Sequence, residues 1–224
     1  MKGRRIVAVA VAGAALAGAG AAAADKEKVQ LSARDQTKAK TIVLRLADLG
    51  GQGKGWAGGP QTPSPNSSLV CKGFNPKQSD LILTGNAASA YQHTGLEFES
   101  EVQLLKTTDM VKRDWQRSVM QPALLPCLEQ QISKTLPAGE RFVSFQRIGF
   151  PKVGDESAAY RGVLSVKAGG QIVKVMIDFA IVGVDRTEIT LITMEPYAAA
   201  SVVGPAEQRL AQVLAGRATP GGTA

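Results

Sequence analysis

The sequence contains one histidine and two cysteines in 224 residues, and aromatic residues make up only 5% of it. A serine or cysteine nucleophile normally acts with a general base, and the single histidine, His93 in the loop sequence YQHTG, gives such a pair little support. Ser157 lacks the surrounding G-x-S-x-G of a nucleophile elbow, and the His–Cys–carboxylate spacing of a zinc site is absent. We therefore expect a chain that is not an enzyme, with no catalytic residue, no metal and no cofactor.

Signatures of phosphate and nucleic-acid binding are also missing. The glycine-rich stretch GQGKG lacks the Walker spacing GxxxxGK(S/T), because Lys54 is followed by a glycine. Three of the 26 basic residues lie in the first five positions, so removal of a leader lowers the basic count to 23 against 19 acidic residues. These remaining charges are spread along the chain, and few aromatic residues are available to stack on bases. We expect no nucleic-acid partner.

The N-terminus has the order of a secretory signal peptide. Lys2, Arg4 and Arg5 precede the apolar run IVAVAVAGAALAGAG, and small residues follow up to Ala24. The run is shorter and richer in alanine and glycine than the roughly 20 strongly apolar residues of a membrane anchor. We predict that residues 1–24 are a signal peptide cleaved near Ala24. The mature chain is then secreted or held in the cell envelope and does not span the membrane; Sec and twin-arginine export both stay open.

The mature length fits a single domain with a sizeable core. Residues 25–36 are polar and are predicted to form a mobile arm, and residues 37–217 form the domain. The stretch at 50–68 is dense in glycine, proline and serine, which is typical of a long loop. Residues 218–224 are expected to form a disordered tail. We expect a monomer.

Hydrophobic periodicity gives the fold class. Apolar residues recur at helical spacing in some segments, whereas other segments alternate with period two, as half-buried strands do. IVKVMIDFAIV (172–182) is nearly continuous in apolar residues, which indicates a central strand covered on both faces. The order is helix, two strands, two helices, four strands, helix. This predicts an α+β fold, an antiparallel sheet of about six strands with helices packed against it. The predicted helices are 37–49, 109–120, one from near Pro126, and 204–218; the strands are 80–92, 96–105, 141–150 and three within 157–194.

The strand LEFESEVQLL (96–105) carries three carboxylates on one face. Glu97, Glu99 and Glu101 alternate with apolar residues, so neighbouring carboxylates repeat about every 7 Å along the strand. Such a row could serve as the acid pair of a hydrolase or, with further ligands, hold a hard cation. A solvated strand face paired with nearby lysines and arginines is the interpretation we favour, because antiparallel sheets often have one wet face.

Two prolines interrupt an apolar, helix-forming run. Pro122 and Pro126 lie four residues apart, and Cys127 follows the second directly. Proline is unfavourable inside a helix but is tolerated in its first turn, so we expect one helix to end near Gln121 and another to begin near Pro126. The other cysteine is Cys71. In an exported chain, two cysteines and no others predict a disulfide between them.

Two further residues are candidates for ligand binding. Trp56 stands in the glycine-rich loop, where it could form a cleft wall or a partner surface, although loop tryptophans often only fix their loop to the core. Asp178 interrupts the apolar strand 172–182. A buried charge needs a partner, so Asp178 is expected either to line a cleft or to pair with Arg161 or Arg147 across the sheet.

Several local patterns resemble one family. They include LADLGGQGKGW before the loop, SLVCKGF around the first cysteine, FPKVGDESAAYRG and IDFAIVGVDRTEITLI. Over roughly residues 40–217 the chain resembles actinobacterial exported domains related to the PknH-like extracellular sensor domain. Such domains look like relatives of a PsbP-like sandwich, with a cleft on one side of a curved antiparallel sheet. The resemblance implies a non-catalytic, ligand-sensing role in the envelope.

These observations give two hypotheses. The first is an exported, non-catalytic binding or sensor-like module of the bacterial cell envelope, with an unidentified envelope ligand or protein as its partner. The alternative is an envelope hydrolase that uses the glutamate face of the strand at 96–105.

Overall fold

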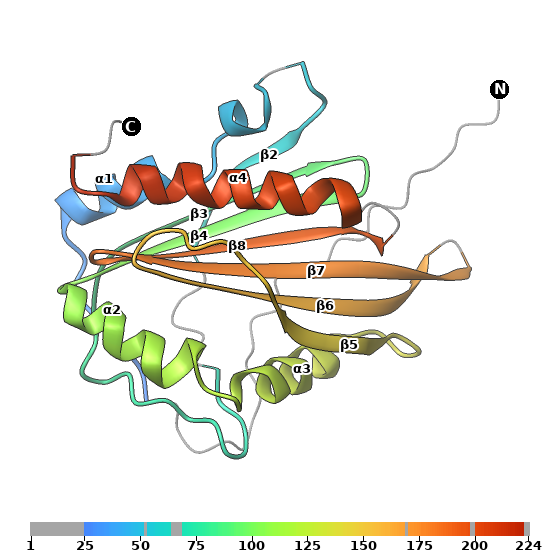
Figure 1. Ribbon diagram of the computed structural model, residues 1–224, viewed down its shortest axis with the longest axis horizontal. Helices are drawn as coiled ribbons and strands as arrows, with labels where there is room; N and C mark the ends of the chain where they lie inside the picture. Colours follow the sequence, from blue (N-terminus) through green and yellow to red (C-terminus); the bar gives the residue numbers. More distant parts are fainter. Residues whose placement is uncertain (1–24, 52, 64–68, 169, 198–199, 222–224) are drawn as a thin grey trace.

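The computed structural model describes residues 25–51, 53–63, 69–168, 170–197 and 200–221. The predicted signal peptide lies outside the described residues. The fold is α+β, as predicted: an open, mostly antiparallel sheet with helices on both faces (Figure 1).

Six long strands form the body of the sheet, in the order β3-β4-β8-β7-β6-β5, and every neighbouring pair among them is antiparallel. Two short strands, which sequence periodicity did not predict, extend the sheet at β3. The strand β1 pairs with β3 in parallel, and β2 pairs with β3 in antiparallel. The bounds are β1 Lys28–Val29, β2 Ala57–Gln61, β3 Ile82–His93, β4 Leu96–Leu105, β5 Arg141–Ile148, β6 Glu156–Ala168, β7 Gln171–Val184 and β8 Thr187–Pro196.

Helices cover the two faces of the sheet from different parts of the chain. On β7, Ala180 and Val182 belong to a core cluster with α1 and α4, whereas Phe179 and Ile181 pack against a cluster with η2 and α3. Successive strand residues point to opposite faces, so these two clusters define the two layers. The helices are α1 Ala33–Ile42, the 3₁₀ turn η1 Leu46–Leu49, α2 Thr108–Asp114, the π-helical turn η2 Trp115–Val119, α3 Leu124–Thr135 and α4 Ala200–Ala218.

The proline-rich corner lies between η2 and α3. The helical segment ends near Met120, and α3 begins at Leu124, two residues earlier than predicted. Pro126 therefore falls in the first turn of α3, where its missing N–H removes no intrahelical hydrogen bond. Cys127 is buried in this turn and forms the predicted disulfide with Cys71; their Cα atoms are 5.6 Å apart.

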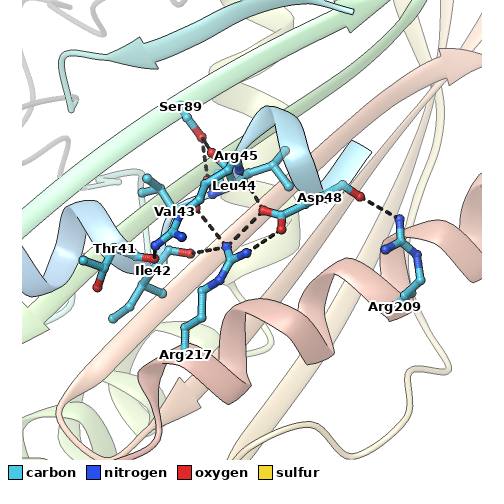
Figure 2. A network of polar contacts seen from close by, with 10 residues as sticks. Thr41, Ile42, Val43, Leu44, Arg45, Asp48, Ser89, Arg209 and Arg217 are labelled. Atoms are coloured by element: carbon cyan, nitrogen blue, oxygen red, sulfur yellow. Dashed lines mark hydrogen bonds and ion pairs between the residues drawn. The ribbon is translucent and has the colours of Figure 1, made fainter. Parts of the chain in front are cut away.

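The connection between α1 and η1 is fixed to the sheet by two serines. Leu44 donates its N–H to Ser100 Oγ at 2.9 Å and accepts from Ser89 Oγ at 2.8 Å (Figure 2). The two hydroxyls are 3.0 Å apart. The extended backbone of Leu44 thereby has both polar groups satisfied although it is buried.

Candidate functional site

A buried polar cluster lies between the sheet and α4. Four residues stand side by side across β4, β8, β7 and β6: Phe98, Thr193, Asp178 and Arg161. All four are on the α4 face, in phase with the apolar residues that contact α1 and α4. Glu207 reaches this row from α4. The sheet therefore brings together polar residues that lie far apart in the sequence.

Asp178 is paired with Arg161, one of the two partners predicted. Arg161 donates from Nε to Oδ1 at 2.8 Å and from Nη2 to Oδ2 at 2.5 Å, a two-pronged contact. The aspartate side chain is only 2% exposed, whereas that of Arg161 is 27% exposed. The hydrogen bonds from Arg161 to Asp178 raise the pKa of the guanidinium. Arg147 is one strand further out on β5, opposite Tyr160, and does not take this place.

Two more carboxyl groups surround this pair. Glu195 at the end of β8 and Glu207 on α4 are almost fully buried. Burial, followed by the charge of Asp178, raises the pKa of Glu195 to about 7. The same two causes, together with a hydrogen bond to Asp178, raise the pKa of Glu207 to about 8. The single guanidinium of Arg161 thus faces three carboxyl groups. Because it cannot neutralise all three, Glu195 and Glu207 have raised pKa values and bind protons more readily.

Three acceptor atoms in this cluster have no hydrogen-bond partner within the described part of the chain. They are Thr193 Oγ1, Glu195 Oε2 and Glu207 Oε1, each shielded from solvent. Buried polar atoms are nearly always hydrogen-bonded in folded proteins, so a group of orphaned acceptors is unusual. Within the described ranges, no set of three or more His, Cys, Asp or Glu side chains is placed to hold a metal ion. The arrangement instead suits groups that donate hydrogen bonds.

Trp56 lies on the same face of the sheet as Asp178. Its ring centroid is 5.6 Å from that of Phe98 and 5.3 Å from that of His93. Phe98 is the first residue of the cross-strand row and lies about two strand spacings, roughly 10 Å, from Asp178, so Trp56 does not contact Asp178 directly. Gly55 makes this approach possible: its φ is +77°, and a Cβ there would lie 2.9 Å from the His93 ring. These contacts fix the loop to the core beside the cluster.

The glutamate row of β4 faces the opposite side of the sheet. Glu97, Glu99 and Glu101 share one face, as predicted, but they are half-buried. The residues directly across from them are neutral and mostly apolar, so the favoured interpretation of a wet face paired with lysines and arginines is corrected. The opposing residues are Gln92, Ala90 and Ala88 on β3 and Met194, Ile192 and Thr190 on β8.

Burial and mutual repulsion raise pKa values along this row. The pKa of Glu97 is raised to about 7, first by burial and then by the charge of Glu99, to which Glu97 is also hydrogen-bonded. Burial also raises the pKa of Glu101, with a smaller contribution from Glu99. The Glu97 carboxyl therefore keeps its proton to a higher pH than an ordinary glutamate does.

A further acidic group adjoins the end of the row. Glu188 lies on β8 opposite Gln103, and burial and the charge of Asp114 raise its pKa well above the ordinary value. Burial raises the pKa of Asp114, which accepts a hydrogen bond from Ser118 Oγ at 2.7 Å. Glu27 reaches the same place from the N-terminal segment, and its pKa is raised to about 7 by burial and by Asp114. Sequence spacing could not show this meeting of three distant segments.

Glu195 and Glu207 are the site residues that sequence reasoning missed, although a signal existed. Glu195 is in phase with the buried Leu191 on β8, since residues two and four apart share a strand face. Glu207 precedes the fully buried Leu210 and Leu214 by three and seven residues, which places it on the inward stripe of α4. An acidic residue in phase with the buried apolar residues of the same strand or helix could therefore have indicated this site from the sequence.

Comparisons with known proteins find distant structural likenesses. No family model matches the chain, and no curated protein matches it. The extracellular domain of PknH from Mycobacterium tuberculosis is similar over 80% of this chain and 94% of the other, at 11% identity and a TM-score of 0.41. LpqN from Mycobacterium tuberculosis, involved in cell envelope biogenesis, is similar over 71% of this chain and 76% of the other, at 12% identity and a TM-score of 0.31.

The first of these neighbours is the domain that the sequence motifs resemble. At these identities and TM-scores, neither likeness carries an argument about a ligand or an activity. Among the helices of the described residues, none combines the length and the apolar character needed to cross a membrane. The functional argument therefore depends on the chain's own residues.

Proposed function

We propose that this chain is an exported, non-catalytic binding module of the bacterial cell envelope. Its ligand contacts the carboxylate cluster of Arg161, Asp178, Thr193, Glu195 and Glu207. Export is supported by the sequence of residues 1–24 and by the disulfide, which is typical of proteins outside the reducing cytosol.

The observation that carries the proposal is the set of three orphaned acceptors. A ligand with hydroxyl or ammonium groups would enter beside the partly exposed Arg161. It would donate to Thr193 Oγ1, Glu195 Oε2 and Glu207 Oε1 once local opening of the cluster uncovers these solvent-shielded atoms. Arg161 retains further N–H groups beyond the two bonds to Asp178, and it is the partly exposed member of the cluster. An amino sugar or another amine-bearing polyol combines the required donors with acceptors for Arg161.

The glutamate row gives less support to the alternative, an envelope hydrolase. A retaining glycosidase holds its two carboxyl groups about 5 Å apart, and an inverting enzyme holds them further apart to admit water. The Glu97 and Glu99 carboxyl groups are hydrogen-bonded to each other, which is closer than either arrangement requires. His93 packs against Trp56 on the α4 side and is not beside this row.

The test is calorimetric titration of the processed chain with glucosamine, N-acetylglucosamine and ethanolamine. The key variant is Glu195→Met/Glu207→Met, which keeps side-chain length and removes two orphaned acceptors. Glu129→Gln/Glu156→Gln, at exposed positions, is the matched control. We expect binding of an amine-bearing probe that weakens at least about ten-fold in the key variant, the loss of roughly one charge-assisted hydrogen bond, and not in the control.

Two results would overturn the proposal. One is a probe that binds the key variant and the wild-type chain equally well. The other is turnover of glycan or ester substrates by the wild-type chain that disappears in Glu97→Gln/Glu99→Gln, since that would establish the hydrolase instead.

A further inference from the structure

The β6–β7 hairpin projects past the ends of the neighbouring strands (Figure 1). All four residues at the start of β7, Gln171 to Lys174, are exposed, whereas the strand is mostly buried from Met176 onward. Ile172 is 74% exposed and Val173 is 38% exposed. Neither side chain is a member of the buried core clusters, and Ile172 in particular projects into solvent.

Cationic side chains stand beside these apolar residues. Lys167 on β6 is directly across from Ile172, and Lys174 is two residues further along the same face of β7. Both lysines are exposed. The Lys174 Nζ lies 5.5 Å from the ring centroid of Tyr197, which is itself half exposed. The tip thus combines an isoleucine, a tyrosine and two lysines.

Other charges near the tip do not cancel this basic character. Glu140 accepts a hydrogen bond from the Lys167 N–H at 3.1 Å, and the exposed Arg141 follows it directly. The two lysines and Arg141 therefore outnumber the one glutamate that contacts the tip within the described residues.

We propose that the β6–β7 tip, formed by Lys167, Ile172, Val173, Lys174 and Tyr197, docks the protein on an anionic lipid surface. Ile172 enters the apolar side of the lipid interface from the face that carries the lysines, and Val173 enters it from the opposite face of the strand. The lysines contact phosphate headgroups, and Tyr197 lies at headgroup level, where its amphipathic ring is favoured. The inference is independent of the ligand proposed for the carboxylate cluster.

The hairpin backbone suits this role. Lys167 and Ile172 are partners in an antiparallel ladder, so the tip carries its own hydrogen-bonded backbone into the interface. A lipid surface also fits the size of the patch better than a protein partner does. Five side chains fall well short of the roughly 20–30 residues that each partner contributes to a stable protein interface.

Flotation of the processed chain with phosphatidylcholine vesicles, with and without phosphatidylglycerol, tests this inference. Lys167→Gln/Lys174→Gln removes the charges, and Ile172→Asp removes the apolar anchor. The matched controls are Lys40→Gln/Lys112→Gln and Leu31→Asp, which change exposed residues on other elements.

We expect the wild-type chain to float with the anionic vesicles, less so with neutral vesicles and less so at high salt. Each lysine removed should weaken partitioning about five-fold, so the double variant should lose about 25-fold, and the controls should float like the wild type. Failure to float with anionic vesicles, or equal flotation of tip variants and wild type, would overturn the inference. So would a dimer in sedimentation that Ile172→Asp dissociates, since the tip would then be a protein interface.

Discussion

The two ends of α4 are anchored in different ways. At its C-terminal end, Arg217 donates to both carboxylate oxygens of Asp48 and, at 3.3 Å, to the carbonyl of Val43 (Figure 2). Arg209 adds a hydrogen bond to the Asp48 carbonyl at 3.0 Å. The Asp48 carboxylate also accepts from the Arg45 N–H at 2.8 Å. At this end one carboxylate, Asp48, is matched by one arginine, Arg217.

Nearer its N-terminal end, α4 presents Glu207 to Asp178 and Glu195, with only Arg161 to compensate them. At the C-terminal end, the hydrogen bonds of the Asp48 carboxylate are made, and they hold the helix to the segment 43–48. The other end holds its charges by taking up protons and leaves acceptors unused, which costs stability. A fold under selection for stability alone would place apolar residues there. The difference is why we assign binding to one end of the helix and anchoring to the other.

The largest expected effect is at the anchored end. Asp48→Ala leaves Arg217 nearly buried without a counter-charge, so unfolding free energy should fall by about 3–5 kcal/mol. Denaturant unfolding at neutral pH measures it. Asp80→Ala, which breaks ion pairs that are about one-third exposed, is the control and should cost no more than about 1 kcal/mol. If both variants lost the same unfolding free energy, the Asp48–Arg217 pair would be no more important for stability than a surface ion pair.

Reduction of the Cys71–Cys127 disulfide should have the next largest effect. The bond closes a chain segment with a sequence separation of 56, and its loss should lower the unfolding free energy by about 2–4 kcal/mol. The described core residues of α4 belong to one cluster, and the disulfide belongs to the cluster of η2 and α3 on the other face of the sheet. The pH dependence of stability should therefore keep its shape. A reduced chain whose pH profile flattened would show that the two regions are coupled.

The open end of α4 should make stability depend on pH. Glu195 and Glu207 have pKa values of about 7 and about 8 in the folded chain, above their unfolded values. The folded state therefore binds more protons, and stability should fall by on the order of 2 kcal/mol between about pH 5 and pH 8. Denaturant titrations at several pH values measure this slope. Glu195→Gln/Glu207→Gln should reduce the slope, and an unchanged slope would place its origin on the other face of the sheet.

Removal of a single buried carboxyl should give the smallest effect. Glu207→Met should raise the unfolding free energy at about pH 8 by roughly 1 kcal/mol, because an apolar side chain replaces a poorly compensated charge. At about pH 5 the gain should shrink, since Glu207 is then protonated in the folded chain. Glu129→Met, at an exposed position of α3, is the control and should not stabilise. Destabilisation by Glu207→Met at both pH values would mean that Glu207 supports the fold.

Sequence reasoning was sufficient wherever one residue type and a local period decide the structure. The alternation of 96–105 gave β4 and its glutamate face, and Asp178 within an apolar strand predicted a buried pair, found with Arg161. Sequence reasoning failed where contacts between distant segments determine the local structure. The strand β2 has the weak strand sequence AGGPQ and forms because β3 offers a free edge.

For the same reason, the sequence predicted only part of the carboxylate cluster: the pair of Asp178 and Arg161, but not Glu195 or Glu207. Which residues surround Asp178 depends on β8 lying between β4 and β7, and local patterns do not give that strand order. The helix α4 begins at Ala200, five residues before Pro205 and earlier than the sequence predicts.

The most direct test of the contrast between the two ends is a carbon-13 NMR titration of the glutamate side-chain carboxyl groups. Glu207→Gln identifies the resonance of Glu207 by its disappearance. We predict that Glu207 titrates at about 8 in the folded chain, far above the ordinary glutamate value of about 4.3. If Glu207 instead titrates in the range of exposed glutamates, near about 4.3, then this end of α4 is compensated like the other and the proposed binding site loses its basis.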